Sequence, residues 1–309
     1  MQSRIASGYQ GGRWAYNADN QLTNFPQLKP FNASAQPTQT QVEYTAQRHT
    51  AKETSDEEEK TYGYNAAERL IRYARTTAGQ GTPDVEARYR YDPFGRRIAK
   101  AVQEGQSVKI TYFFYSDTGL LGEANAQGQM TKAYAFHPHK AQQGLWSTDP
   151  IWQADVSQGQ VTNSATRIHY LHTDHLGTPV LGTSKQGART WKAVTEAFGA
   201  TGTLPESQVE MNLRLPGRYF DISMGVTYNY KRDYQQISGR YIQQDPVGLN
   251  GGVNMYGYSS QKPFFRFYTL GLSDVGGCPE CEYKDTPDDW KLISVGLPGA
   301  WEVGCLDTN

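Results

Sequence analysis

The sequence predicts an all-β fold, and three observations lead to that prediction. Tyrosine, with 21 residues, outnumbers leucine, with 18, and aromatic residues favour strands. Glycine reaches 31 residues, which is typical of tight turns between strands. One short pattern also recurs along the chain, in which an aromatic residue precedes a turn-forming Asn, Asp or Gly and then an aliphatic or basic residue. We therefore expect stacked β-hairpins that form a curved, spiralling sheet.

Four hairpin units are visible in the first half of the chain, and a longer run follows near the end. The units read YNADNQL, YNAAERL, YDPFGRRI and YSDTGLL, and they begin at Tyr16, Tyr64, Tyr91 and Tyr115. The run from Tyr219 to Leu249 holds two similar turns. Four glycines in these turns are expected to take a positive φ, namely Gly95, Gly119, Gly225 and Gly239.

One strand shows the alternation of a half-buried sheet clearly. In Val108–Tyr115 (VKITYFFY), apolar or aromatic residues fall at every second position from Val108 to Phe114. An isolated hairpin is marginal in water, so the units must share one buried face. We expect the side of the strand that carries Val108, Tyr112 and Phe114 to belong to that face.

Composition divides the chain into three regions. Residues 1–140 hold the hairpin units, with a disordered insertion expected near residues 26–60, which are poor in apolar side chains and include KETSDEEEK. Residues 141–272 form a second region. Residues 273–309 form a short acidic tail with eight acidic and two basic side chains, a net charge of −6, whereas the remainder carries 28 basic and 23 acidic ones, or +5.

Charge and hydropathy exclude several function classes. The formal net charge is −1, so no overall field favours nucleic acid or anionic lipid. The chain begins without a basic region followed by an apolar stretch, and no run reaches the roughly 18 apolar residues of a membrane helix. These features predict a protein of the producing cell's cytoplasm; if it is exported, a specialised secretion system must carry it.

Three segments resemble the core-associated region of Rhs/YD-repeat proteins, and the hairpin units resemble the YD repeats that precede that region. The segments are YLHTDHLGTPV (Tyr170–Val180), the run Arg218–Leu249, and FFRFYTLGL (Phe264–Leu272). The resemblance covers most of residues 10–272. It implies a β shell that the core region closes around a variable C-terminal segment, which in that family is typically a toxin of a polymorphic toxin or type VI secretion effector.

The same resemblance implies self-cleavage by two aspartates, after the last Leu of a D-P-x-G-L motif. By position, the first aspartate is Asp245. The second position is occupied by Tyr268, within the degenerate motif Tyr268-Thr269-Leu270-Gly271-Leu272. A carboxylate dyad works because two acids in one site cannot both ionise, so one serves as acid and the other as base. A tyrosine is a neutral donor near pH 7 and cannot supply the base. We therefore expect cleavage after Leu272 to be lost or severely slowed.

Two alternatives to a non-enzymatic shell fragment stay open. Asp245 pairs with another acid, such as Asp221 or Asp233, in a residual autoprotease, or the tail itself is a toxin remnant. As partners we expect an upstream Rhs shell segment or a second copy that pairs through open sheet edges, and also a secretion apparatus or an immunity protein. No nucleic acid or membrane partner is expected.

Neither of two possible metal sites is favoured, and no cofactor is expected. On an extended strand His169 and His172 point to opposite faces, so they cannot converge on one ion with His175 unless the strand bends. Cys278 and Cys281 have the spacing of half a zinc knuckle, and Cys305 adds a third thiol, but a closed site needs four ligands.

Overall fold

The computed structural model confirms the all-β class. It describes residues 13–27, 38–116, 119–138, 148–251, 254–259, 266–267 and 275–276. Within these residues the regular elements are strands and one short 3₁₀ helix, η2 (Gly248–Gly251). None of the described residues forms a helix long and apolar enough to cross a membrane.

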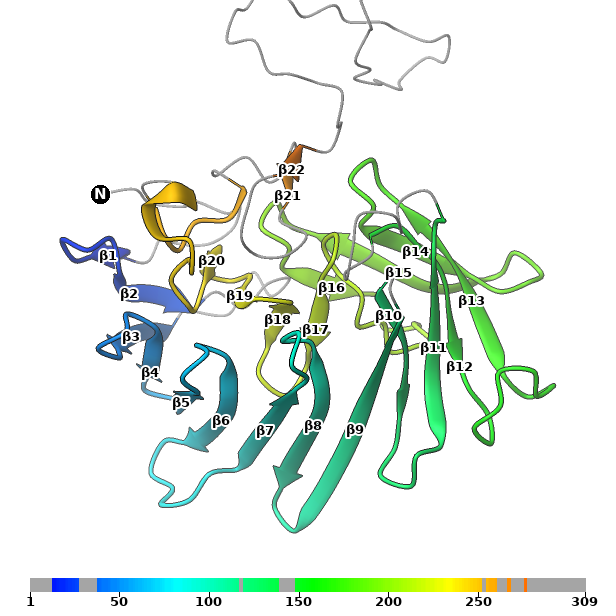
Figure 1. Ribbon diagram of the computed structural model, residues 1–309, viewed down its shortest axis with the longest axis horizontal. Helices are drawn as coiled ribbons and strands as arrows, with labels where there is room; N and C mark the ends of the chain where they lie inside the picture. Colours follow the sequence, from blue (N-terminus) through cyan, green and yellow to red (C-terminus); the bar gives the residue numbers. More distant parts are fainter. Residues whose placement is uncertain are drawn as a thin grey trace, which may run out of the picture.

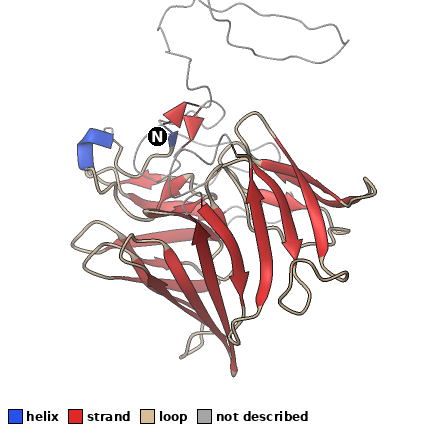
Figure 2. Cartoon of the chain, turned by 45° about the vertical axis from the view of Figure 1, so that its right-hand side comes forward, coloured by secondary structure: helices blue, strands red, loops and turns tan. Residues whose placement is uncertain are grey.

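Sixteen strands form one antiparallel sheet whose order follows the chain from β1 to β16. Its ends are not paired with each other, so the sheet is an open, curved wall (Figures 1 and 2). The strands are β1 (Ala15–Tyr16), β2 (Leu22–Gln27), β3 (Thr38–Tyr44), β4 (Thr50–Thr54), β5 (Glu58–Tyr64), β6 (Leu70–Thr77), β7 (Val85–Tyr91), β8 (Arg97–Glu104), β9 (Ser107–Ser116), β10 (Gly119–Ala124), β11 (Met130–Phe136), β12 (Pro150–Asp155), β13 (Arg167–Thr173), β14 (Pro179–Thr183), β15 (Arg189–Thr195) and β16 (Thr201–Thr203).

One turn geometry recurs between these strands. The first residue of each turn donates its N–H to the carbonyl four residues on and accepts from the N–H three residues on, where the backbone takes a positive φ. This is the three-residue hairpin loop that ends in a left-handed residue. The first and left-handed residues are Asn17/Asn20, Thr45/Arg48, Asn65/Glu68, Asp92/Gly95, Asn125/Gly128, Asp174/Gly177, Ser184/Gly187 and Glu196/Gly199. The four glycines expected to have positive φ all do.

A ladder of tyrosine hydroxyls ties consecutive hairpins together. The hydroxyl of each unit's tyrosine donates to the backbone carbonyl that lies six residues after the tyrosine of the preceding unit. The pairs are Tyr44 to Leu22 (3.1 Å), Tyr64 to Thr50 (2.8 Å), Tyr91 to Leu70 (2.7 Å) and Tyr115 to Arg97 (2.9 Å). The unit that begins at Tyr44 (YTAQRHT) was not predicted, because its turn contains no Gly, Asn or Asp.

A second, smaller sheet packs against one face of the large one. We call it the core sheet; its strands are β17 (Tyr219–Asp221), β18 (Val226–Asn229), β19 (Arg232–Gln235) and β20 (Arg240–Tyr241). Most of its residues are buried, and hydrophobic clusters join it to the large sheet, for example Phe113 with Tyr219 and Tyr89 with Val226. A short pair, β21 (Arg266–Phe267) and β22 (Val275–Gly276), completes the described strands.

The expected disordered insertion near residues 26–60 is wrong for residues 38–60, which belong to β3, β4 and β5. The composition predicted disorder wrongly because these strands are stabilised by hydrogen bonds between strands and by cross-strand ion pairs such as Lys52 with Glu59 (2.8 Å). Buried Glu53 also accepts from Gln235 of the core sheet (2.8 Å). A strand whose polar groups find partners does not need a large apolar surface. Residues 28–37 lie outside the described part.

The expected buried side of Val108–Tyr115 is also wrong, although the alternation itself is present. Phe113 is 6% exposed and faces the core sheet, whereas Val108, Tyr112 and Phe114 are 59%, 39% and 44% exposed. Both sides of β9 carry apolar residues, so hydrophobicity alone did not distinguish them. The position of the core sheet decides which side is covered.

The sheet continues without a break across residue 140, because β11 pairs with β12. The division at residues 140 and 272 therefore remains a prediction from sequence motifs. Most of the tail, residues 277–309, lies outside the described part.

Candidate functional site: the core sheet and its buried charges

The core sheet contacts the hairpin turns along one rim of the large sheet. Its tyrosine hydroxyls donate to carbonyls inside the turns, because a turn exposes carbonyls that no strand partner uses. Tyr230 binds Phe94 (2.6 Å), Tyr234 binds Phe198 (3.0 Å), and Tyr256, beyond β20, binds Arg48 (2.6 Å). Arg240 donates to Asn20, and Arg69, next to a fifth turn, donates to Tyr230. The core sheet thus binds turns that lie about 180 residues apart in sequence.

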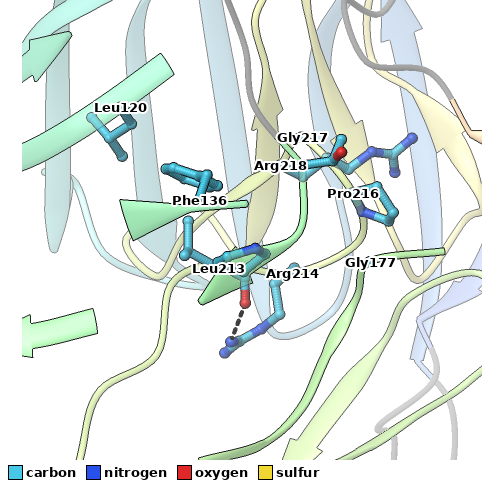
Figure 3. Close-up of a pocket in the computed structure, with 10 residues that line it drawn as sticks. Leu120, Phe136, Gly177, Leu213, Arg214, Pro216, Gly217 and Arg218 are labelled. Carbon is cyan, nitrogen blue, oxygen red and sulfur yellow. Dashed lines mark hydrogen bonds between the residues drawn. The ribbon is translucent and has the colours of Figure 1, made fainter. Parts of the chain in front are cut away.

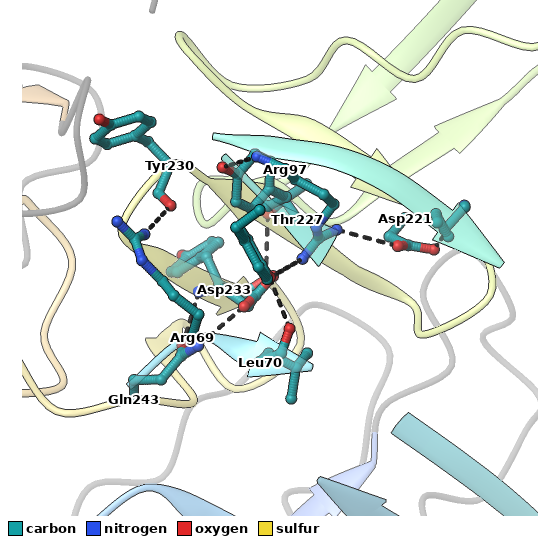
Figure 4. Close-up of polar contacts among 12 residues, drawn as sticks. Arg69, Leu70, Arg97, Asp221, Thr227, Tyr230, Asp233 and Gln243 are labelled. Atoms are coloured by element: carbon teal, nitrogen blue, oxygen red, sulfur yellow. Dashed lines mark hydrogen bonds and ion pairs between the residues drawn. The ribbon is translucent and has the colours of Figure 1, made fainter. Parts of the chain in front are cut away.

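Arg97 holds two carboxylates of the core sheet together (Figure 4). Its guanidinium, 1% exposed, binds Asp233 at 2.8 Å and Asp221 at 3.2 Å, and Lys100 binds Asp221 at 3.0 Å. The guanidinium also lies over the rings of Tyr89 and Tyr228, at 4.2 and 4.1 Å from their centroids. Buried charges persist only when they are paired and hydrogen-bonded, and this cluster meets that condition.

The two carboxylates differ in electrostatics. Burial opposes ionisation of Asp221, but Lys100 and Arg97 outweigh it and hold the pKa of Asp221 below its ordinary value. Burial raises the pKa of Asp233, and Arg97 and Gln243 oppose that rise only in part. The Gln243 amide clamps Asp233 at both ends: it donates to the carboxylate (2.9 Å) and accepts from the Asp233 N–H (2.7 Å).

Asp245 lies in a separate ion pair. Its carboxylate binds Arg232 at 2.9 Å and accepts from the Val247 N–H at 3.1 Å. Arg232 lies over the ring of Tyr241, 3.8 Å from the centroid. Burial raises the pKa of Asp245, with Arg232 acting in the opposite direction. An open, mostly polar pocket of about 230 Å³ adjoins this loop, with Gln244 and Pro246 in its wall.

The structure brings some of the predicted residues together and separates others. Asp221 and Asp233 share Arg97, whereas Asp245 is bound to Arg232 instead. Within the described residues, no second carboxylate contacts Asp245, so the arrangement supplies only half of an acid–base dyad. Tyr268, Thr269, Leu270, Gly271 and Leu272 lie outside the described part of the chain.

The cations of this site were missed in the sequence. Arg97 follows a predicted turn, and Arg232 lies in the tyrosine-rich run from Tyr219 to Leu249. Their partners are more than 100 residues away for Arg97 and 13 residues away for Arg232, so no local spacing indicates them.

Two further sites complete the description. His169 is buried and lies 3.4 Å from Asp155, whereas His172 is exposed beside Thr183, so the two histidines lie on opposite faces of β13, as predicted. A small, mostly apolar cavity of about 20 Å³ lies between the large sheet and the segment that leads into β17 (Figure 3). Burial lowers the pKa of Arg214 in its wall to about 10.

Comparison with known proteins identifies the family. The family model described as RHS protein matches residues 168–204, which span most of β13 and all of β14 to β16. Toxin protein Tse5 of Pseudomonas aeruginosa is 33% identical over 234 residues, which cover 71% of this chain and 18% of that protein. The probable deoxyribonuclease RhsB of Dickeya dadantii is 29% identical over 209 residues, covering 67% of this chain and 13% of that protein. The chain belongs to the Rhs family.

A further relative and a solved structure are also similar to this Rhs chain. The double-stranded DNA deaminase toxin A of Burkholderia cenocepacia is 33% identical over 211 residues, which cover 64% of the Rhs chain and 14% of that toxin. The solved TcdB2-TccC3-TEV structure matches with a TM-score of 0.59 and 18% identity, covering 84% of the Rhs chain and 13% of that chain. The likeness to that structure is one of fold. The Rhs chain spans less than a fifth of each of these proteins.

Proposed function

We propose that this Rhs chain is a non-enzymatic scaffold, the shell-and-core part of a polymorphic toxin or a type VI secretion effector. The observation that carries the proposal is the use of the core sheet's polar groups. Its tyrosine hydroxyls bind hairpin turns, and its aspartates are paired with buried cations, so these groups hold the wall in shape. The toxin relatives support the class of protein, and the YD-repeat interpretation is supported by the recurring turns and the tyrosine ladder.

We further propose that self-cleavage after Leu272 is lost. Asp245 is bound to Arg232, and the position that the family resemblance assigns to a second aspartate holds Tyr268. A single carboxylic acid with a raised pKa can donate a proton, but a water nucleophile also needs a base. A phenol with an ordinary pKa of about 10 does not serve as that base near neutral pH.

Intact mass measurement of the purified 309-residue chain tests this loss. We expect one species of full mass, and a species that ends at Leu272 would contradict the proposal. A double variant, Tyr268→Asp with Thr269→Pro, is expected to restore cleavage at that bond. Adding Asp245→Asn to the double variant serves as the control, because cleavage through a restored dyad must then disappear.

The alternative, an autoprotease that pairs Asp245 with Asp221 or Asp233, is disfavoured by their separate cations. Asn substitutions at the three positions, followed on a gel, distinguish the two ideas. If the unmodified chain is cut and a single Asn substitution stops it, the scaffold proposal fails. A toxin role for residues 273–309 has its own test, which is growth of cells that express that segment alone.

The partners are proposed on the same basis. The end strands β1 and β16 each have one edge without a strand partner among the described strands, and such an edge suits pairing with an upstream shell segment. A secretion apparatus and an immunity protein are the further partners expected of such an effector, which would be made in the cytoplasm and exported from there.

A further inference from the structure

The outer face of the large sheet, which we define as the side away from the core sheet, changes character at β8. Directly paired residues lie on the same side of a sheet, so the register shows which side chains are neighbours. One row runs from Arg72 to Arg88, Ala101 and Ile110 across β6 to β9. A second row runs from Arg90 to Ala99, Tyr112 and Ala124 across β7 to β10. The charged half of the face therefore ends at β7.

From β9 to β13 the centre of the outer face is apolar, whereas the polar side chains of Thr131 and His172 lie toward its margin. The central row is Phe114, Gly122, Ala133, Ala154 and Ile168, one residue from each of the five strands. The next row is Ala135, Trp152 and Tyr170. Neither row contains a charged residue. We call this surface, together with Val108, Ile110 and Tyr112, the apolar outer face.

Its large side chains are exposed to solvent. Val108 is 59% exposed, Phe114 44%, Tyr112 39%, Tyr170 37% and Ile168 36%. With the ordinary areas of such residues, they present roughly 450 Å² of mostly apolar surface. That is the size of the largest patch on a typical monomer, and such patches mark interaction sites.

We propose that the apolar outer face binds the same face of a second copy of this chain. Two copies related by a two-fold axis would bury up to about 900 Å² in total from these side chains, which is the size of a weak, transient interface. The two rows of this face carry no charged side chain, so pairing of two copies brings no like charges together and buries no unpaired charge. Two sheets packed face to face about 10 Å apart are a standard arrangement, and alternating aromatic and branched residues are typical of their inner faces. The charged residues of β7, such as Arg88, form the polar rim.

This interface differs from pairing through strand edges, since it uses side chains instead of backbone groups. It also explains why the pattern of Val108–Tyr115 predicts burial for a side that one copy leaves exposed. An interface of this size is weak, so dimers are expected in the micromolar range and above.

Sedimentation velocity on the full chain, from about 1 to 200 µM, tests the proposal. We expect a concentration-dependent change from monomer to dimer. Phe114→Lys and Val108→Lys each place a charge within the face and are expected to weaken dimerisation at least about tenfold. The matched control is Ile222→Lys, since Ile222 is 62% exposed but lies in the turn after β17, away from this face. Unchanged melting temperatures verify that the variants fold.

Three outcomes overturn the proposal. The first is a monomer at every concentration, which leaves the face without this occupant. In the second, association persists in both face variants, which assigns it to the sheet edges or to another surface. In the third, all three lysine variants weaken association equally, which indicates a general effect of charge.

Discussion

Removal of Arg97 is expected to destabilise the protein strongly, and the structure indicates which carboxylate bears the cost. Arg97→Met keeps the length of the side chain and much of its contact with the tyrosine rings, but it removes the only guanidinium bound to Asp233 among the described residues. Asp221 keeps Lys100 at 3.0 Å. Loss of one partner of a buried ion pair costs about 3–5 kcal/mol.

Urea denaturation followed by intrinsic fluorescence measures the change in the free energy of unfolding. Arg88→Met is the control, because the Arg88 side chain is 74% exposed and pairs with Glu86 on the outer face; its effect should stay within about 0.5 kcal/mol. Asp233→Asn added to Arg97→Met is expected to recover about 1–3 kcal/mol, because it removes the carboxylate left without its cation.

Asp221→Asn in the Arg97→Met background is expected to recover less than Asp233→Asn does, since Lys100 still neutralises Asp221. A destabilisation below about 1 kcal/mol for Arg97→Met would refute the reasoning, because it would mean that the buried cluster contributes no more than a surface pair. Equal recovery by the two Asn substitutions would refute the assignment of the cost to Asp233.

Three further predictions concern the wall itself. Burial lowers the pKa of His49, so the imidazole of the unfolded state takes up a proton before that of the folded state as the pH falls below about 6.5. The free energy of unfolding should therefore decline below that pH, by up to about 1.4 kcal/mol per unit of pKa difference between the two states. Urea midpoints at pH 7 and pH 5 measure the decline, which His49→Gln should reduce. Tyr91→Phe removes one hydrogen bond of the tyrosine ladder and should lower the free energy of unfolding by about 1–2 kcal/mol. The control Tyr112→Phe, at an exposed residue, should change it by close to nothing. Equal effects of the two substitutions in thermal melts would argue against the ladder. Gly95→Ala should destabilise more than Gly187→Ala, although both glycines have φ near +80°. A Cβ at position 95 would overlap the buried Arg69 guanidinium, which its bond to Tyr230 holds in place, whereas one at 187 meets nothing within 4 Å. Equal losses of melting temperature would contradict this.

The turns show how much of the fold can be predicted from local sequence patterns. Turn residues such as Asp92 and Gly95 act within a few residues of chain, so the hairpins around them could be predicted from spacing alone. The unit at Tyr44 was missed because its turn places Arg48 at a positive φ without any of the usual turn formers. In that unit the hydrogen bond from the Tyr44 hydroxyl to the Leu22 carbonyl holds the hairpin against the preceding one, and a local sequence pattern does not show this bond.

The candidate site was predictable only in part. The family resemblance directed attention to Asp245. The sequence alone also shows that Tyr268 stands where the family has an aspartate, and a phenol cannot replace a carboxylate as the base. The pairing of Asp221 and Asp233 with Arg97, and of Asp245 with Arg232, was not foreseen. Attraction between charges depends on distance in space, and local sequence patterns do not contain that distance.

Alternation, glycine-bearing turns and the abundance of tyrosine are enough to specify strands, hairpins and an open all-β wall, because each arises from neighbours in the chain. Which side of that wall is covered depends on contacts between residues far apart in sequence. On β9 both sides are apolar, and only the docking of the core sheet buries Phe113 and leaves Phe114 in water. The polar strands β3 to β5 are ordered for the same reason, since their stability comes from partners supplied by neighbouring strands and by the core sheet.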